Sequence, residues 1–159
     1  MSAAIEIAEI RCATPAERDA LTALHRRSSY VWEDDREALD AHPEVFGVDA
    51  RALTDARVRV AVGADGALLG FATLAACEDG AYELEDLFVE PQLLRRGVGH
   101  ALVRDAQARA GGRRVTVVAG ARTVPFYGRL GFVAGETVET RFAPAVRMWW
   151  EPGPPADGR

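Results

Sequence analysis

Apolar and polar residues alternate over Ile5–Arg11, the first patterned segment of the chain, and this period of two predicts a β-strand. Helix-start signals follow directly. Thr14 can act as an N-cap, Pro15 suits the first helical position, and Glu17 completes a capping box. The sequence therefore predicts a helix that runs from here to about Arg27.

The middle of the chain predicts an antiparallel meander. Before it, a stretch that mixes aromatic and acidic residues is expected to hold a second short helix, ending before Pro43. Three segments that read as strands then follow at Val58–Val62, Leu68–Ala76 and Ala81–Val89, with glycine-containing turn signals between them. These segments are expected to form three consecutive strands joined by short turns.

The last part of the chain predicts one helical crossover and further short elements. The expected elements are a helix at Gly97–Ala110 stopped by Gly111-Gly112, a strand at Val115–Val118, a short helix at Thr123–Leu130, and strands at Phe132–Phe142 and Val146–Trp150. The order is β-α-α-β-β-β-α-β-α-β-β. A meander followed by a helical crossover implies an α/β (α+β) fold, with a mixed sheet of about seven strands flanked by about four helices.

Composition narrows the class of protein. With 159 residues and 48% hydrophobic residues, the chain is most simply one domain, taken as residues 1–151, with a disordered tail at 152–159. The net charge of −5 argues against a general nucleic-acid binder. No run of residues is apolar enough to span a bilayer, and Cys12 and Cys77 form no C-x-x-C pair. Neither membrane insertion nor a metal site is therefore expected, and a reducing cytoplasm fits.

Two glycines, Gly97 and Gly99, lie at the N-terminus of the predicted crossover helix, directly after Arg95 and Arg96. Unpaired N–H groups at a helix N-terminus attract anions, and glycines let a ligand approach the backbone, so this loop suits a phosphate or pyrophosphate. A Rossmann fingerprint needs a third glycine where Leu102 stands, and a P-loop needs G-K-[ST], so both are excluded. A tight turn with solvated arginines is the alternative interpretation.

Two sequence motifs resemble a known enzyme family. The stretch LEDLFVEPQLLRRGVGHALV resembles the acetyl-CoA-binding motif of the GNAT superfamily of N-acetyltransferases, and VPFYGRLGFV is similar to the second signature of that family. Motif spacing and element order extend the resemblance from about Ile5 to Trp150. The resemblance implies a GNAT-like fold and an acyltransferase that uses acetyl-CoA as cosubstrate. Two positions depart from the usual pattern, because Leu94 stands in place of Gln or Arg and Gly120 in place of Asn.

The resemblance also implies which residues contact acetyl-CoA. Main-chain groups of the third meander strand would bind the pantetheine arm like an added strand, and an N–H near the end of that strand would stabilise the oxyanion. The loop before the crossover helix would hold the pyrophosphate. The implied cofactor-binding residues are Leu87, Phe88, Val89, Arg95, Arg96, Gly97, Val98, Gly99, His100 and Phe126.

Acetyl transfer to an amine needs an acid for the departing thiolate and an acceptor for the proton of the amine. The resemblance makes Tyr127 the acid, with a purely structural tyrosine as the alternative. It also places Glu83 where some family members have a base. Glu85 is closer to the thioester, and both carboxylates lie on the strand face of Leu87 and Val89. The alternative interpretation is that Glu83 and Glu85 are both solvated carboxylates of the strand face without a catalytic role.

The acceptor pocket of this fold is usually built from the first two helices and the last strands, which makes Tyr30, Trp32, Glu33 and Arg141 the expected substrate-binding residues. Acids and aromatics suit a cationic amine, whereas Arg141 suits a carboxylate; a solvated acidic helix is the alternative. The expected reaction is direct attack of a primary amine, from a small molecule, peptide or protein, on the thioester in a ternary complex. A non-catalytic acyl-CoA-binding sensor or subunit is the alternative function, and a homodimer is left open.

Overall fold

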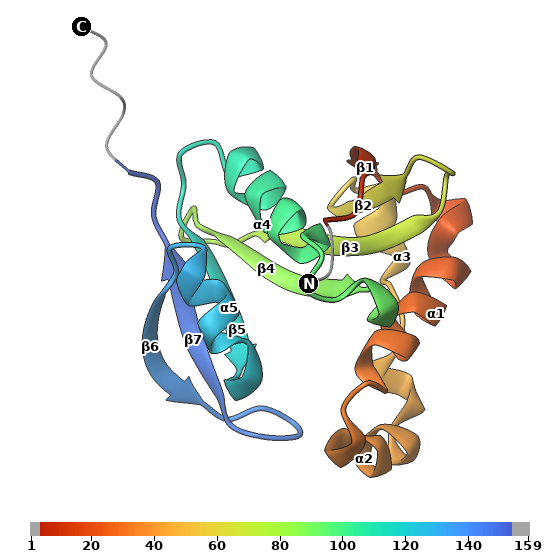
Figure 1. The fold of residues 1–159 in the computed structure, drawn as a ribbon. Helices are drawn as coiled ribbons and strands as arrows, with labels where there is room; N and C mark the ends of the chain where they lie inside the picture. Colours follow the sequence, from red (N-terminus) through yellow and green to blue (C-terminus); the bar gives the residue numbers. More distant parts are fainter. Residues whose placement is uncertain (1–3, 154–159) are drawn as a thin grey trace, which may run out of the picture. The chain divides into compact units, whose positions relative to one another are not determined.

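A computed structural model describes residues 4–153 of the chain (Figure 1). These residues fall into two compact units, the first comprising residues 4–74 and 86–105 and the second residues 75–85 and 106–153. The expectation of a single domain at residues 1–151 stays a prediction. Most of the tail expected at 152–159 lies outside the described residues.

The described residues form seven strands and five α-helices. The strands are β1 (Ile7–Cys12), β2 (Val58–Gly63), β3 (Leu68–Ala76), β4 (Tyr82–Val89), β5 (Val115–Gly120), β6 (Val133–Val138) and β7 (Ala145–Trp150). The helices are α1 (Arg18–Ser29), α2 (Arg36–Ala41), α3 (Ala50–Thr54), α4 (Val98–Arg109) and α5 (Val124–Arg129). Every expected strand is present, with ends shifted by at most four residues.

The predicted α/β fold of about seven strands and about four helices is confirmed, with one further short helix, α3, that the sequence analysis did not expect. This helix has only five residues, too few for an amphipathic period to be visible in the sequence. Its start is fixed by Asp49, whose Oδ1 accepts a hydrogen bond from the Arg51 N–H at 3.0 Å. The observed order is therefore β-α-α-α-β-β-β-α-β-α-β-β.

The seven strands form one mixed sheet with the order β1-β2-β3-β4-β5-β7-β6. The pairs β1–β2, β2–β3, β5–β7 and β6–β7 are antiparallel, whereas β4 and β5 pair in parallel. The crossover through α4 produces this parallel step, because a helical connection returns the chain to the same end of the sheet. The prediction of a mixed sheet is confirmed.

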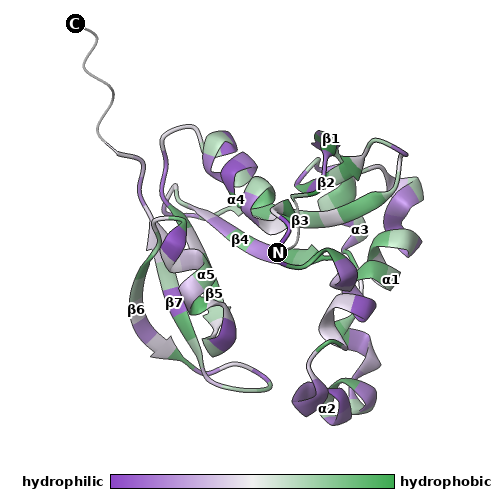
Figure 2. Cartoon of the chain, in the orientation of Figure 1, coloured by the Kyte–Doolittle hydropathy of each residue, from purple (hydrophilic) through white to green (hydrophobic). Residues whose placement is uncertain are grey.

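The core of the first unit lies where α1 and α3 cover the strands β2 and β3 (Figure 1). The strands β2 and β3 are mostly hydrophobic, whereas α2 is mostly hydrophilic (Figure 2). The fully or almost fully buried residues of this core are Ala13, Leu21, Leu24, Val48, Ala52, Leu53, Val58, Val60, Val62 and Phe71. Burial of these side chains is the main stabilising contribution to the unit.

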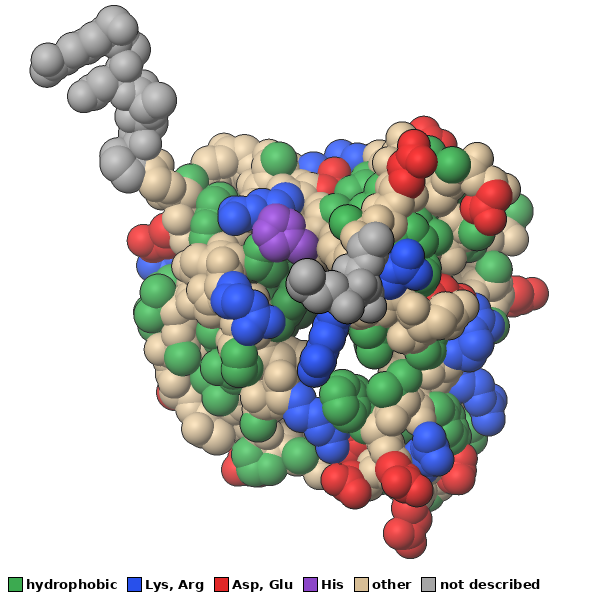
Figure 3. All heavy atoms as spheres, viewed as in Figure 1, with side chains coloured by type: hydrophobic (Ala, Val, Ile, Leu, Met, Phe, Trp, Pro, Cys, Tyr) green, Lys and Arg blue, Asp and Glu red, His purple; other side chains and the backbone are tan. Residues whose placement is uncertain are grey.

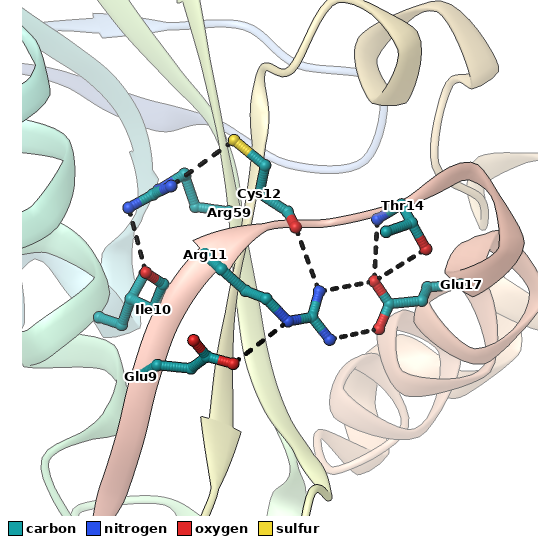
Figure 4. Close-up of polar contacts among 7 residues, drawn as sticks. All are labelled: Glu9, Ile10, Arg11, Cys12, Thr14, Glu17 and Arg59. Carbon is teal, nitrogen blue, oxygen red and sulfur yellow. Dashed lines mark hydrogen bonds and ion pairs between the residues drawn. The ribbon is translucent and has the colours of Figure 1, made fainter.

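The connection between β1 and α1 is held by the predicted capping box (Figure 4). The Thr14 N–H donates to Glu17 Oε1 at 2.8 Å, and the Arg11 guanidinium donates to both Glu17 oxygens at 2.9 Å. The hydrogen bond from Arg11 holds the pKa of Glu17 at about 2, well below its usual value. Beside it, Arg59 donates to the Ile10 carbonyl and to both oxygens of Asp105.

The second unit packs α5 against the strand β5. Its core holds Val115, Val117, Leu130, Phe132 and Met148, all at most 4% exposed. One buried polar contact fixes α4 to this core, where Gln107 Nε2 donates to the Leu130 carbonyl at 3.1 Å. A buried amide that is hydrogen-bonded in this way stabilises one arrangement of the helix.

Candidate active site

The two carboxylates predicted as bases lie on β4, in the second unit. Glu83 is partly buried and Glu85 is exposed. Both lie near Cys77, because burial first, and then the negative charges of Glu83, Asp79 and Glu85, raise the pKa of that thiol. That Glu83 and Glu85 point to the same side of the strand stays a prediction.

The parallel pairing of β4 with β5 is short. It joins Tyr82 to Val115 and Glu83 to Thr116, and within the described residues it does not continue to Leu84 and Glu85. Parallel ladders are normally regular, so a pairing that stops after two residues leaves backbone groups of β4 available for another partner.

The end of β4 belongs to the first unit and contains the expected pantetheine contacts. Leu87 and Phe88 are partly buried, and Val89 is 8% exposed. The Phe88 ring stacks on His25 at 3.9 Å between centroids, and burial lowers the pKa of His25 to about 4. His25 is therefore neutral near pH 7, and its Nδ1 accepts a hydrogen bond from the Gly47 N–H at 3.4 Å.

The loop that follows β4 has an unusual backbone. Arg95 has a φ of 62° and Gly97 a φ of 95°, both in the left-handed region that favours glycine. A Cβ at Gly97 would meet nothing within 4 Å, so the glycine is required by backbone conformation and not by packing. The Ile5 N–H donates a hydrogen bond to the Arg96 carbonyl at 3.1 Å, which connects the loop to the segment before β1.

The helix α4 begins directly after this loop, at Val98, with Gly99 and His100 in its first turn. The first N–H groups of a helix have no intrahelical partner, and the helix dipole gives them partial positive charge. Val98 is 1% exposed and anchors the helix, whereas His100 is exposed. The N–H groups of the loop and of the helix start are thus of the kind that binds anions.

An ion pair between Glu90 and Arg27, both in the first unit, holds the residue that leads from β4 into the loop. Glu90 follows β4 and is only 9% exposed, and its two carboxylate oxygens accept hydrogen bonds from Arg27 in the last turn of α1.

The two positions that depart from the family pattern lie at the surface. Leu94 is 42% exposed, and Gly120 ends β5 with its carbonyl bonded to the Thr123 hydroxyl.

The predicted acid, Tyr127, lies on α5 in the second unit and is 6% exposed. Its ring packs edge-on against Phe126 and Phe132, with centroids 5.0 and 5.4 Å away. Burial raises the pKa of the phenol well above its usual value, so Tyr127 keeps its proton at neutral pH. No hydrogen-bond partner of its hydroxyl is found in residues 4–153, which leaves the hydroxyl without a structural role there.

The residues expected to bind the acceptor lie in both units. In the first unit, Trp32 is 44% exposed, Glu33 is exposed, and the Tyr30 hydroxyl donates to Asp40. The acidic side chains of the segment 33–44 gather over α2 (Figure 3). In the second unit, Arg141 is exposed and lies over the ring of Phe142, with its guanidinium carbon 5.6 Å from the centroid.

The sequence analysis missed two residues of the sheet, Asp86 on β4 and Thr73 on β3. Asp86 is partly buried, and burial raises its pKa above the usual value, against the smaller, opposite effect of a side-chain hydrogen bond with Thr73. Thr73 is 3% exposed, so the Asp86 carboxyl is the polar neighbour of its buried hydroxyl.

Two further observations concern metal ions and membranes. In residues 4–153, no group of three or more His, Cys, Asp and Glu side chains is placed to hold a metal ion. In the same residues, no helix has the length and apolar character to cross a bilayer.

Comparison with known proteins identifies the fold. The sequence matches the family model of the acetyltransferase (GNAT) domain over residues 48–152. No curated protein sequence matches the chain. Among solved structures, a GCN5-related N-acetyltransferase from Rhodopseudomonas palustris has 20% identity and a TM-score of 0.74, over 96% of this chain and 100% of that one.

Two other solved structures are similar. The PaiA N-acetyltransferase from Thermoplasma acidophilum, in complex with coenzyme A, has 16% identity and a TM-score of 0.69, over 91% of this chain and 98% of that one. An acetyltransferase from Corynebacterium glutamicum, described as a histone acetyltransferase and related acetyltransferase, has 18% identity and a TM-score of 0.70, over 94% and 99%. The structural similarity to these proteins, given by the TM-scores, establishes the common fold. The family model covers more than half of the chain. The chain therefore belongs to the GNAT family of acetyltransferases.

Proposed function

We propose that the protein is an acetyl-CoA-dependent N-acetyltransferase that transfers the acetyl group to a primary amine by direct attack in a ternary complex. The observation that carries the proposal is the backbone of the loop before α4, where Arg95 and Gly97 both adopt left-handed φ values. Such a backbone directs successive N–H groups toward one point, as a pyrophosphate requires. The Thermoplasma acidophilum relative is solved with coenzyme A, which supports the same ligand here.

The proposed contacts with acetyl-CoA follow the two sequence motifs. The pyrophosphate binds to N–H groups of residues 95–100, with Arg95 and Arg96 adding positive charge. The pantetheine arm binds to main-chain groups of Leu87, Phe88 and Val89 like an added strand, as the family resemblance implies. Phe126 packs beside Tyr127 and contributes apolar surface near the thioester.

The proposed chemistry uses residues that hold or move protons. An ammonium with an ordinary pKa of about 10.4 must lose a proton before it can attack, and we assign this proton to Glu83 or Glu85, directly or through water. The Val89 N–H stabilises the negative charge on the carbonyl oxygen. As the bond between carbon and sulfur breaks, Tyr127 donates its proton to the thiolate.

The test combines acetyl-CoA titration by calorimetry with detection of free CoA thiol over a panel of primary amines. Gly97→Ala should weaken acetyl-CoA binding by about tenfold or more, because an L-residue resists a φ of 95° and the loop must rearrange. Gly66→Ala is the matched control. Gly66 has a φ of 84° and open space around it, so the substitution introduces the same backbone strain in the turn between β2 and β3, outside the loop itself.

Three results are distinguishable. Binding that is lost in Gly97→Ala but kept in Gly66→Ala, together with amine-dependent release of CoA, supports the enzyme. Binding without turnover for any amine supports the alternative, a non-catalytic acyl-CoA-binding sensor. Absence of binding by the wild-type protein would contradict both functions.

A further inference from the structure

The end of β4 is attached to the last turns of α1 at two points, both within the first unit (Figure 1). The His25 ring stacks on Phe88, at 3.9 Å between centroids. Two residues further along each element, Arg27 donates hydrogen bonds from Nε, at 3.2 Å, and from Nη2 to the two oxygens of Glu90. The C-terminal end of α1 is therefore fixed to β4 and to the first residue that follows it.

Glu90 holds the start of the loop before α4 through three different groups. Its N–H donates to the Leu69 carbonyl of β3 at 3.0 Å, and its own carbonyl accepts a hydrogen bond from the Leu93 N–H at 2.9 Å. The second of these bonds closes the short 3₁₀ turn Pro91–Leu93. The side chain of Glu90 makes the third contact, with Arg27. Arg27 thus connects α1 to the residue from which the loop begins.

The charge of Glu90 matters because the loop is proposed to bind a pyrophosphate. Glu90 precedes Arg95 by five residues, and its carboxylate is largely withdrawn from water, with the side chain 11% exposed. A buried carboxylate needs an opposite charge, and without one it repels an anion that binds nearby. Arg27 supplies this charge in a two-point contact, whose planar geometry matches that of a carboxylate.

We propose that Arg27 is a positioning residue of the acetyl-CoA site, which acts through Glu90 to hold the loop in its binding conformation and to neutralise the carboxylate at its start. This inference rests on the proposed acetyltransferase function and adds to it a residue outside both sequence motifs. The left-handed backbone of Arg95 makes the loop sensitive to such support, because a strained conformation persists only where the surrounding structure defines it.

Calorimetric titration of acetyl-CoA compares the wild type with Arg27→Gln, Glu90→Gln and the variant that carries both substitutions. Arg27→Gln should weaken binding by about tenfold or more, because it leaves the Glu90 carboxylate charged and without its partner. Glu90→Gln keeps the size of the side chain and removes the charge, so its loss of affinity should be at most about threefold. The double variant should resemble Glu90→Gln, so that the second substitution restores most of the affinity lost in Arg27→Gln.

The control is Arg11→Gln, which breaks a pair of the same geometry at the other end of α1, where Arg11 donates to both oxygens of Glu17. Its melting temperature should fall, as that of Arg27→Gln does, while acetyl-CoA binds within about twofold of the wild-type affinity. Wild-type affinity in Arg27→Gln would overturn the proposal, and so would equal losses in Arg27→Gln and Arg11→Gln. An affinity that Glu90→Gln does not restore would overturn the role assigned to the charge.

Hydrogen exchange of the ligand-free proteins provides a second measurement, which needs no acetyl-CoA. The amides of residues 92–97 should exchange at least about threefold faster in Arg27→Gln than in the wild type, and at the wild-type rate in Arg11→Gln. Where Arg27→Gln does not fold, Arg27→Lys takes its place, because lysine keeps the charge and loses the two-point contact. Equal exchange in all the proteins would overturn the proposal. Absence of acetyl-CoA binding by the wild type would contradict the proposed function, and the exchange rates alone then decide whether Arg27 positions the loop.

Discussion

Gly70 on β3 lies so close to Phe88 on β4 that a Cβ at Gly70 would stand 2.8 Å from the Phe88 carbonyl oxygen. It would also stand 3.2 Å from Val98 and 3.3 Å from Leu102, both on α4. The glycine thus allows the strand that carries the proposed pantetheine contacts to approach its neighbour closely.

Gly70→Ala should lower the free energy of unfolding by about 1–3 kcal/mol, because backbone atoms cannot yield as a flexible side chain can. Urea denaturation measures this change. Gly128→Ala is the matched control, since a Cβ at Gly128 in α5 meets nothing within 4 Å and alanine there should stabilise by about 0.4–1 kcal/mol. Equal effects of the two substitutions would show that the close approach at Gly70 has no energetic consequence.

Tyr127→Phe should lower kcat by roughly 10²–10⁴-fold while the KM for acetyl-CoA changes by less than about threefold, as expected for loss of a general acid. The urea midpoint should stay the same, because no hydrogen bond of the hydroxyl is found in the described residues and the ring contacts with Phe126 and Phe132 are kept. Steady-state kinetics over a range of pH provide the measurement. Near-normal kcat in the variant would mean that the hydroxyl takes no part in the reaction.

Glu83→Gln or Glu85→Gln should depress kcat/KM most strongly at low pH and shift the apparent pKa of the pH–rate profile, because the amine loses its proton to one of these carboxylates. The expected loss is roughly 10²-fold or more for the residue that acts as base. Glu83 is the first choice, from the family resemblance. If both variants keep the wild-type profile, the proton leaves through water alone.

His25 should make stability depend on pH. Its pKa is about 4 in the folded chain and about 6.5 in the unfolded chain, so the unfolded state binds the proton more tightly between these values. The stabilisation is fully present above pH 6.5 and is lost as the pH falls through 6.5 toward 4. Because the ring is partly exposed, the change should be about 1–2 kcal/mol.

The measurement is urea denaturation of the wild type and His25→Phe at pH 7 and pH 4.5. Between pH 7 and pH 4.5, the unfolding free energy of the wild type should fall by more than that of His25→Phe. His100→Gln is the control, because His100 is exposed and should produce no such shift. If the unfolding free energies of the wild type and His25→Phe fall by the same amount, the pH dependence comes from groups other than His25.

Much of the fold could be predicted from local pattern. The meander was visible because three segments with strand character are separated by turns at Gly66 and Gly80, whose φ values of 84° and 88° favour glycine. The capping box of Thr14 and Glu17 was readable because its two residues lie three positions apart. By contrast, α3 depends on an Asp49 cap and on packing of Ala52 and Leu53 in the core, which a five-residue pattern does not reveal.

The candidate site was predictable to a lesser degree. Motif spacing identified the loop at 95–100 and Tyr127, because both belong to short contiguous signatures. Asp86 was overlooked since strand alternation placed it on the face opposite Glu83 and Glu85. Its environment depends on Thr73, which lies on another strand, and no spacing along the chain brings the two together.

The left-handed backbone of Arg95 has a consequence for the entropy of binding. A non-glycine residue in this region costs about 1–2 kcal/mol, and the folded chain carries that cost before any ligand arrives. Arg95→Gly would relieve the strain but give the free loop more conformations to lose on binding, whereas Arg95→Ala would remove the same charge and keep the backbone restricted. Acetyl-CoA should therefore bind more weakly to the Gly variant than to the Ala variant, with the difference in the entropy measured by calorimetry. Strain at Arg95 would thus preorganise the loop, so that the ligand meets N–H donors already in place.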